Sequence, residues 1–220
     1  MVKVERSYPA PESLAIEKVK SSGKYDKPDV IARLKRDFND KCYICEMKGL
    51  QDPVVEHLLP HKNGEYVDRK FDWDNLFWSC GHCNGVKNRK EYDIGIIDCC
   101  KRDPEKLLMF DLVEGDVVVY PFDEYDREAT LTAKLIYEVF NVQNTGMRIQ
   151  KSYHRLKKLQ EEMNCFYKLL EKYKKFPGNK RYKAMIEASL RRESVFAAFK
   201  RAYIRKRQRE FSELTDIVKL

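Results

Sequence analysis

The feature that most constrains the fold is the placement of four cysteines in two closely spaced pairs. Cys42 and Cys45 form the first Cys-x-x-Cys pair, and Cys80 and Cys83 form the second pair after 34 intervening residues. Two residues between thiolates allow one tight turn to direct both sulfurs at a single ion, and two such turns complete a tetrahedral zinc site. Four sulfur ligands leave no open coordination position, so we expect this zinc to be structural.

A redox-active Cys-x-x-Cys motif is the competing interpretation of these pairs, but two pairs that flank one short segment favour metal binding. The other three of the seven cysteines, Cys99, Cys100 and Cys165, are expected to be ordinary thiols. An odd number of cysteines, with no secretory apolar run in the first twenty residues, argues against disulfides and predicts a cytoplasmic protein. No stretch approaches the roughly 20 apolar residues of a membrane helix, so we expect no membrane partner.

Charge is distributed unevenly along the chain. Residues 148–210 contain 20 Lys and Arg against 6 Asp and Glu, a net charge of +14, whereas the whole chain carries +8. The remainder is therefore acidic, at about −6. Clustered basic side chains favour a nucleic-acid partner, because contacts with phosphates release condensed counterions. Helices with solvated basic faces are the simpler alternative.

The residue pattern predicts more helix than strand. Residues 11–39 are expected to form two helices, the second from Pro28 to Phe38, because proline suits a first helical turn. The apolar run before Glu56 predicts a strand, and residues 117–120 predict another that follows a turn. From Thr130 onward the pattern is helical. Residues 177–179 divide this part into a helix of about 25 residues and a second long helix.

The segment between the cysteine pairs, with the residues just after it, holds groups suited to phosphodiester hydrolysis. This reaction needs a base to activate water and a cation to neutralise charge on the phosphate. His57 is suited to be the base, since an imidazole accepts a proton near neutral pH. Glu56 and Asn84 offer oxygen ligands of the kind that Mg²⁺ or Mn²⁺ prefers. Asn75 would hold the loop or orient His57 through its amide.

The order of these residues resembles a known nuclease family. The pattern Cys-x-x-Cys, Glu-His-x-x-Pro, Asp-Asn-Leu and Cys-x-x-Cys-Asn-x-x-Lys is similar to the zinc-knuckle branch of the HNH endonucleases, which use a ββα-metal finger. The resemblance implies catalytic roles for His57, Asn75 and Asn84. It also implies that Glu56, His57 and Asn84 surround a Mg²⁺-like ion. Many family members have histidine at the position of Asn84, and asparagine also occurs there.

Basic residues after the second cysteine pair are predicted to contact nucleic acid. The family often places a basic residue near the phosphate at the position of Lys87, and Arg89 and Lys90 follow it. An ordinary surface charge is the simpler interpretation of Lys87. Similarly, Glu56 and His57 could form an ion pair at a strand end.

Several other residues between and after the pairs have two interpretations. Asn75, taken alone, could simply cap a turn. His61 could touch metal or phosphate, or be an ordinary loop histidine. His82 could donate a hydrogen bond to a thiolate. Trp73 and Trp78 could stack on bases, but we expect them to pack in the core.

Within this family, the chain resembles the HNH subunits of Septu-type and retron-associated anti-phage systems, the PtuB-like proteins. The residues that carry it lie at 42–46, 56–57, 71–76, 79–85, 97–105, 115 and 129–141. This resemblance implies a toxic, divalent-metal nuclease that acts with an ATPase partner of the PtuA type, in some systems within a retron complex.

Together these features predict an α+β fold that is mostly α. The expected regions are an N-terminal helical segment (1–40), an HNH nuclease finger with its zinc site (41–125) and a basic helical region (126–220). The expected function is a metal-dependent endonuclease that cleaves DNA or RNA. A non-catalytic zinc-ribbon module that binds nucleic acid or protein is the alternative, although such a module needs none of the acid, histidine and asparagines.

Overall fold

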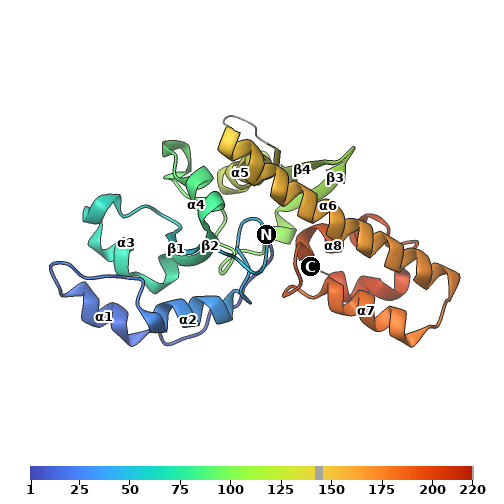
Figure 1. Ribbon diagram of the computed structural model, residues 1–220, viewed down its shortest axis with the longest axis horizontal. Helices are drawn as coiled ribbons and strands as arrows, with labels where there is room; N and C mark the ends of the chain where they lie inside the picture. The colour runs from blue at the N-terminus through green and yellow to red at the C-terminus, as the bar shows by residue number, and fades with distance from the viewer. Residues whose placement is uncertain (142–145, 220) are drawn as a thin grey trace.

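The structure, a computed structural model, describes residues 1–141 and 146–219. It has an α+β fold that is rich in helix and contains two small antiparallel sheets of two strands each (Figure 1). The predicted α+β class is therefore confirmed, whereas the HNH finger and the division into three regions stay predictions. Within the described residues, no helix is both long and apolar enough to cross a membrane.

Two short helices precede the cysteine pairs, as predicted. α1 spans Glu12–Lys18 and α2 spans Pro28–Asp37. Pro28 occupies the first turn of α2, where its missing N–H costs no helical hydrogen bond. At the lower left of Figure 1, α2 packs against β2 (Leu76–Cys80), and α1 lies next to α2 and below α3 (Val67–Phe71).

The first sheet and the helix that follows it form the centre of the molecule. β1 (Pro53–His57) pairs antiparallel with β2 (Leu76–Cys80). Helix α3 (Val67–Phe71) lies in the connection between them, and α4 (Gly81–Lys87) begins directly after β2. Trp73 and Trp78 are both buried here, which confirms their predicted place in the core.

A β-hairpin forms the second sheet. β3 (Leu108–Val113) pairs with β4 (Asp116–Pro121). The two residues between the strands, Glu114 and Gly115, have φ angles of 51° and 94°. Positive φ at both positions is what a type I′ hairpin turn requires. β4 confirms the strand predicted at 117–120, and its partner β3 was not predicted.

The C-terminal part is helical. Its helices are α5 (Arg127–Asn141), α6 (Gly146–Lys175), α7 (Lys180–Leu190), α8 (Ala197–Lys206) and a final 3-10 helix over Ser212–Val218. The break predicted at 177–179 is confirmed, and residues 142–145 of the predicted helical part lie outside the described residues. The prediction of one long helix after the break is wrong. The chain leaves α7 at Arg191 and passes through Phe196, whose φ is 49° and whose side chain is buried, so core packing outweighs helix propensity there.

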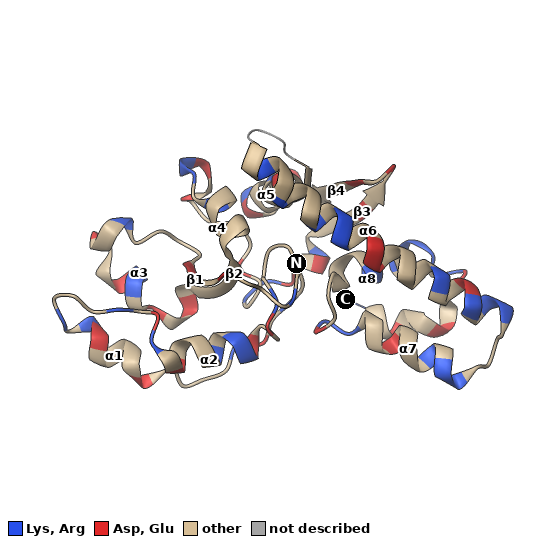
Figure 2. Ribbon diagram, in the orientation of Figure 1, with Lys and Arg blue, Asp and Glu red and all other residues tan. Residues whose placement is uncertain are grey.

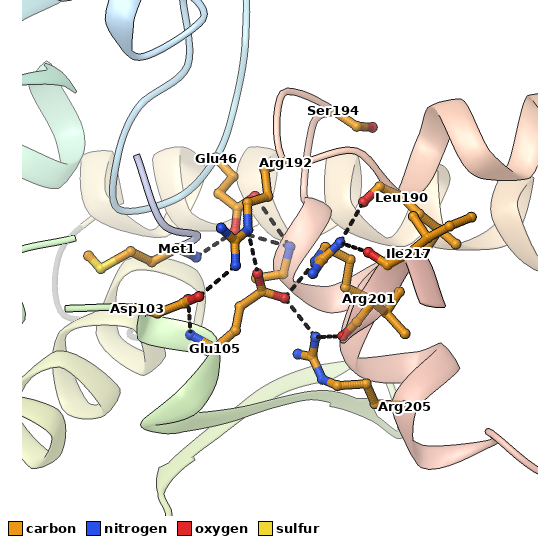
Figure 3. Close-up of polar contacts among 12 residues, drawn as sticks. Met1, Glu46, Asp103, Glu105, Leu190, Arg192, Ser194, Arg201, Arg205 and Ile217 are labelled. Carbon is orange, nitrogen blue, oxygen red and sulfur yellow. Dashed lines mark hydrogen bonds and ion pairs between the residues drawn. The ribbon is translucent and has the colours of Figure 1, made fainter. Parts of the chain in front are cut away.

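A buried ion-pair cluster joins these helices to the centre. Glu105 lies in a short 3-10 turn before β3 and is fully buried. Its Oε1 atom accepts hydrogen bonds of 2.7 Å from both Arg201 and Arg205, and its Oε2 atom accepts one of 3.2 Å from Arg192 (Figure 3). The apolar side chains buried around the cluster belong to one core that includes residues of all three predicted regions.

Candidate functional site

The two cysteine pairs meet in one buried cluster. Cys42 and Cys45 lie on a turn before β1, whereas Cys80 ends β2 and Cys83 lies in the first turn of α4. All four sulfur atoms lie within 4.8 Å of one another, and those of Cys45 and Cys80 are 3.9 Å apart. A tetrahedral zinc with bonds of about 2.3 Å would hold its sulfurs about 3.8 Å apart. The four cysteines could therefore bind a metal such as zinc.

A positive charge from a distant helix lies against this cluster. Arg155 of α6 donates a hydrogen bond of 3.1 Å from Nη2 to Cys80 Sγ, and its side chain is buried. Four thiolates around one divalent ion leave an excess of negative charge, which a buried guanidinium offsets. Among the described residues, His82 makes no hydrogen bond to a thiolate, which was one of the roles considered for it. Its Nε2 atom lies 3.0 Å from the Val139 carbonyl, so the ring links α4 to α5 instead.

Four of the predicted site residues line one open pocket beside β1 and α4. The pocket has a volume of about 350 Å³, and its walls include Glu56, His57, Asn84 and Lys87. Asn84 and Lys87 lie three residues apart on α4 and so share a face of that helix. The side chain of Asn84 has no hydrogen-bond partner among the described residues, which leaves its amide oxygen available to a ligand.

His57 is held in a defined tautomer. Its Nε2 atom lies 3.1 Å from the carbonyl oxygen of Lys70. A carbonyl can only accept, so Nε2 carries the proton and Nδ1 is the unprotonated acceptor. Burial lowers the pKa of His57 to about 4, so the ring is neutral at pH 7 and able to take up a proton.

Glu56 is buried, and both of its carboxylate oxygens have partners. Lys87 Nζ lies 2.6 Å from Oε1, and the Tyr43 hydroxyl donates a hydrogen bond of 2.6 Å to Oε2. Lys87 also donates to the carbonyl oxygens of His57 and Leu58, so all three of its ammonium hydrogens are in use. The ion pair considered for Glu56 therefore forms with Lys87 and not with His57. Each oxygen of Glu56 keeps a second lone pair for a cation, but Lys87 has no hydrogen left for a phosphate.

Asn75 holds the loop that follows β1. Its Oδ1 atom accepts a hydrogen bond of 2.8 Å from the Leu59 N–H, and its Nδ2 atom donates bonds of 2.9 Å to the carbonyls of Leu59 and Arg69. It does not line the pocket and makes no hydrogen bond with His57. Asn75 was expected either to hold this loop or to orient His57, and its contacts correspond to holding the loop.

The other basic residues predicted to contact nucleic acid lie outside the pocket. Arg89 pairs with Glu138 and with Glu91, and Lys90 is exposed. Lysines and arginines recur along α6, α7 and α8, with acidic residues between them (Figure 2). The predicted nucleic-acid contacts of Arg89 and Lys90 stay predictions. The contact predicted for Lys87 is also untested, although its three ammonium hydrogens are engaged within the protein.

Two further aromatic side chains contribute to the pocket. His61 and Tyr25 line it, and the Tyr25 ring packs edge-on against His57 with the ring centroids 4.5 Å apart. The sequence left the role of His61 open. It gave no signal for Tyr25, because this residue lies between α1 and α2, far along the chain from the cysteine pairs.

Comparisons with known proteins do not extend this description. No protein-family model matches the chain, and no curated protein matches it significantly.

Proposed function

We propose that this chain is a divalent-metal-dependent HNH endonuclease that hydrolyses phosphodiester bonds. The observation that carries the proposal is the pocket in which Glu56, His57 and Asn84 meet, on the same hairpin and helix that carry Cys80 and Cys83. β1, β2 and α4 follow one another in the order of a ββα-metal finger. In this proposal the four cysteines hold a structural zinc that fixes the finger.

His57 acts on the attacking water. Its Nδ1 atom accepts a proton as the water oxygen attacks phosphorus in line with the leaving oxygen. The hydrogen bond from Nε2 to the Lys70 carbonyl keeps the required tautomer and stabilises the charge that the ring gains. Asn75 supports this arrangement indirectly, because it fixes the carbonyl of Arg69 next to Lys70.

Glu56 and Asn84 would hold the catalytic Mg²⁺ or Mn²⁺, since hard cations prefer oxygen ligands. When bound, such an ion neutralises charge on the phosphate and on the leaving oxygen. Lys87 and Tyr43 hold the Glu56 carboxylate in one orientation through short hydrogen-bonded contacts. The free amide of Asn84 faces no competing protein donor among the described residues.

The substrate in this proposal is nucleic acid, either DNA or RNA. The basic helices α6, α7 and α8 would guide its backbone or dock a protein partner, and the net charge of +14 over residues 148–210 supports both roles. The PtuB-like resemblance further suggests a cytoplasmic defence effector that acts with an ATPase partner of the PtuA type, in some systems within a retron complex.

A cleavage assay tests the nuclease proposal. Wild-type protein is incubated with plasmid DNA, single-stranded DNA and tRNA in the presence of Mg²⁺, Mn²⁺ or EDTA, beside His57→Ala and with the zinc content of each protein measured. His154→Ala is the matched control, because His154 is an exposed histidine of α6. We expect metal-dependent cleavage that His57→Ala abolishes and His154→Ala preserves. Cleavage by His57→Ala at the wild-type rate would contradict the assignment.

A non-catalytic zinc-ribbon module is the second candidate, and the buried pair between Glu56 and Lys87 is the observation that favours it. A carboxylate engaged by an ammonium is a weaker cation ligand than a free one. Nucleic-acid binding without turnover in any divalent metal would support this alternative.

A further inference from the structure

We propose that His61 is a substrate-contacting residue that donates a hydrogen bond from Nε2 to a non-bridging phosphate oxygen. This inference rests on the proposed function, because it assigns a further contact within the same pocket. His61 begins the 3-10 turn Lys62–Gly64 and follows His57 by four residues.

The backbone holds His61 in the same tautomer as His57, but through the other ring nitrogen. The Gly64 N–H donates a hydrogen bond of 3.0 Å to His61 Nδ1. A ring nitrogen that accepts a hydrogen bond carries no proton, so the neutral ring carries its proton on Nε2. His57 carries its proton on Nε2 as well, but donates it to the Lys70 carbonyl. The two rings therefore offer the pocket one acceptor, Nδ1 of His57, and one donor, Nε2 of His61.

The position of the two rings suits a shared ligand. Their centroids lie 4.6 Å apart with an angle of 63° between the ring planes, and both rings line the same pocket. Tyr25 packs edge-on against both, with centroid distances of 4.5 Å to His57 and 5.9 Å to His61, and so limits their movement. The Nε2 atom of His61 has no hydrogen-bond partner among the described residues.

A phosphate needs donors in this pocket, and Lys87 is not available to supply one. Its three hydrogens are bound to Glu56 and to two backbone carbonyls. Of the two histidine rings that line the pocket, that of His61 is the one whose N–H is not already donated to a backbone carbonyl. A phosphodiester is the acceptor that the proposed reaction brings next to His57, so the contact would come from a neutral imidazole and not from the predicted lysine.

Phosphorothioate substrates test this contact. Sulfur in place of a non-bridging oxygen accepts hydrogen bonds poorly, so the wild-type protein should cut one diastereomer more slowly than the oxygen substrate. His61→Ala should lower kcat/KM on the oxygen substrate by about 10- to 100-fold, as expected for loss of a hydrogen bond to a charged group. In His61→Ala the difference in rate between the oxygen substrate and the phosphorothioate substrate should largely disappear. His61→Gln, whose amide can donate, should recover part of the rate.

Two controls separate His61 from other contacts. If the slower cleavage of the phosphorothioate substrate arises at the metal, the loss of rate should become smaller when Mn²⁺ replaces Mg²⁺. If it arises at His61, the loss of rate should stay the same. Binding of the uncleaved oxygen substrate in EDTA gives a readout without turnover, and His61→Ala should weaken it. If His61→Ala does not fold or bind zinc, the comparison is made with His61→Phe, which keeps an aromatic ring but has no N–H to donate.

The outcomes distinguish this inference from the proposed function. Cleavage by the wild-type protein with the same sulfur penalty in His61→Ala would overturn the role of His61 and leave the nuclease intact. Absence of wild-type cleavage under all conditions would contradict the proposed function. In that case unchanged affinity of His61→Ala for nucleic acid in EDTA would overturn the contact as well.

Discussion

Replacing Glu105 with alanine should lower the free energy of unfolding by about 3–5 kcal/mol, the range for removing one partner of a buried ion pair. The Glu105 carboxylate is 0% exposed, and the guanidinium of Arg201 beside it is only 4% exposed. Arg201 cannot readily turn toward solvent, because its Nη1 atom also donates to the carbonyls of Leu190 and Ile217. The substitution therefore leaves a buried positive charge without its anion.

Urea unfolding followed by circular dichroism, with zinc held constant, measures this loss. For a chain of this size about 1 kcal/mol corresponds to about 2–4 °C in Tm, so Tm should fall by about 6–20 °C. The matched control is Glu161→Ala, because Glu161 forms an exposed ion pair of 3.0 Å with Lys158, and solvent-exposed pairs contribute little to stability. If Glu105→Ala unfolds within about 1 kcal/mol of the wild type, the reasoning from buried charge is refuted.

Two further predictions concern the metal cluster and the loop after β1. Cys83→Ala should reduce bound zinc and lower Tm, because metal-binding free energy is folding free energy in such a site. Metal analysis measures the zinc content and calorimetry measures Tm. The control Cys165→Ala, at an exposed thiol, should change neither. Asn75→Ala should lower the cleavage rate about 10- to 100-fold. It should also destabilise the fold by about 1–3 kcal/mol, because it leaves backbone groups of Leu59 and Arg69 without their partner. A wild-type rate in a folded Asn75→Ala protein would count against the positioning role.

The sequence was sufficient to predict those parts of the fold that depend on strict local chemistry. A metal cluster needs its thiols at fixed spacing, so the two cysteine pairs could be recognised without a structure. Pro28 marked the start of α2, and residues 177–179 marked the end of α6, because proline and glycine restrict or release the backbone locally.

The contacts that the sequence did not reveal join residues far apart along the chain. Nothing in the basic pattern of α6 distinguishes Arg155, which contacts Cys80, from the exposed lysines beside it. The pairing of Lys87 with Glu56 depends on the relative position of α4 and β1, so a residue predicted at the phosphate proved to be buried. Similarly, the end of α7 depends on the burial of Phe196 and not on a helix-breaking residue.

The turn that carries the first cysteine pair is also the surface on which the loop before α8 rests. Lys41 and Glu46 flank this pair and are both buried. Lys41 Nζ donates to the Arg192 and Ser194 carbonyls at 2.5 and 3.1 Å, and the Ala198 N–H donates to Glu46 at 3.3 Å. We therefore expect metal binding at this turn to be linked to docking of the C-terminal helices, and such linkage is reciprocal. A ligand that drew this loop away would lower the affinity of the cysteine cluster for the metal. Loss of the metal would raise the affinity for that ligand by the same factor.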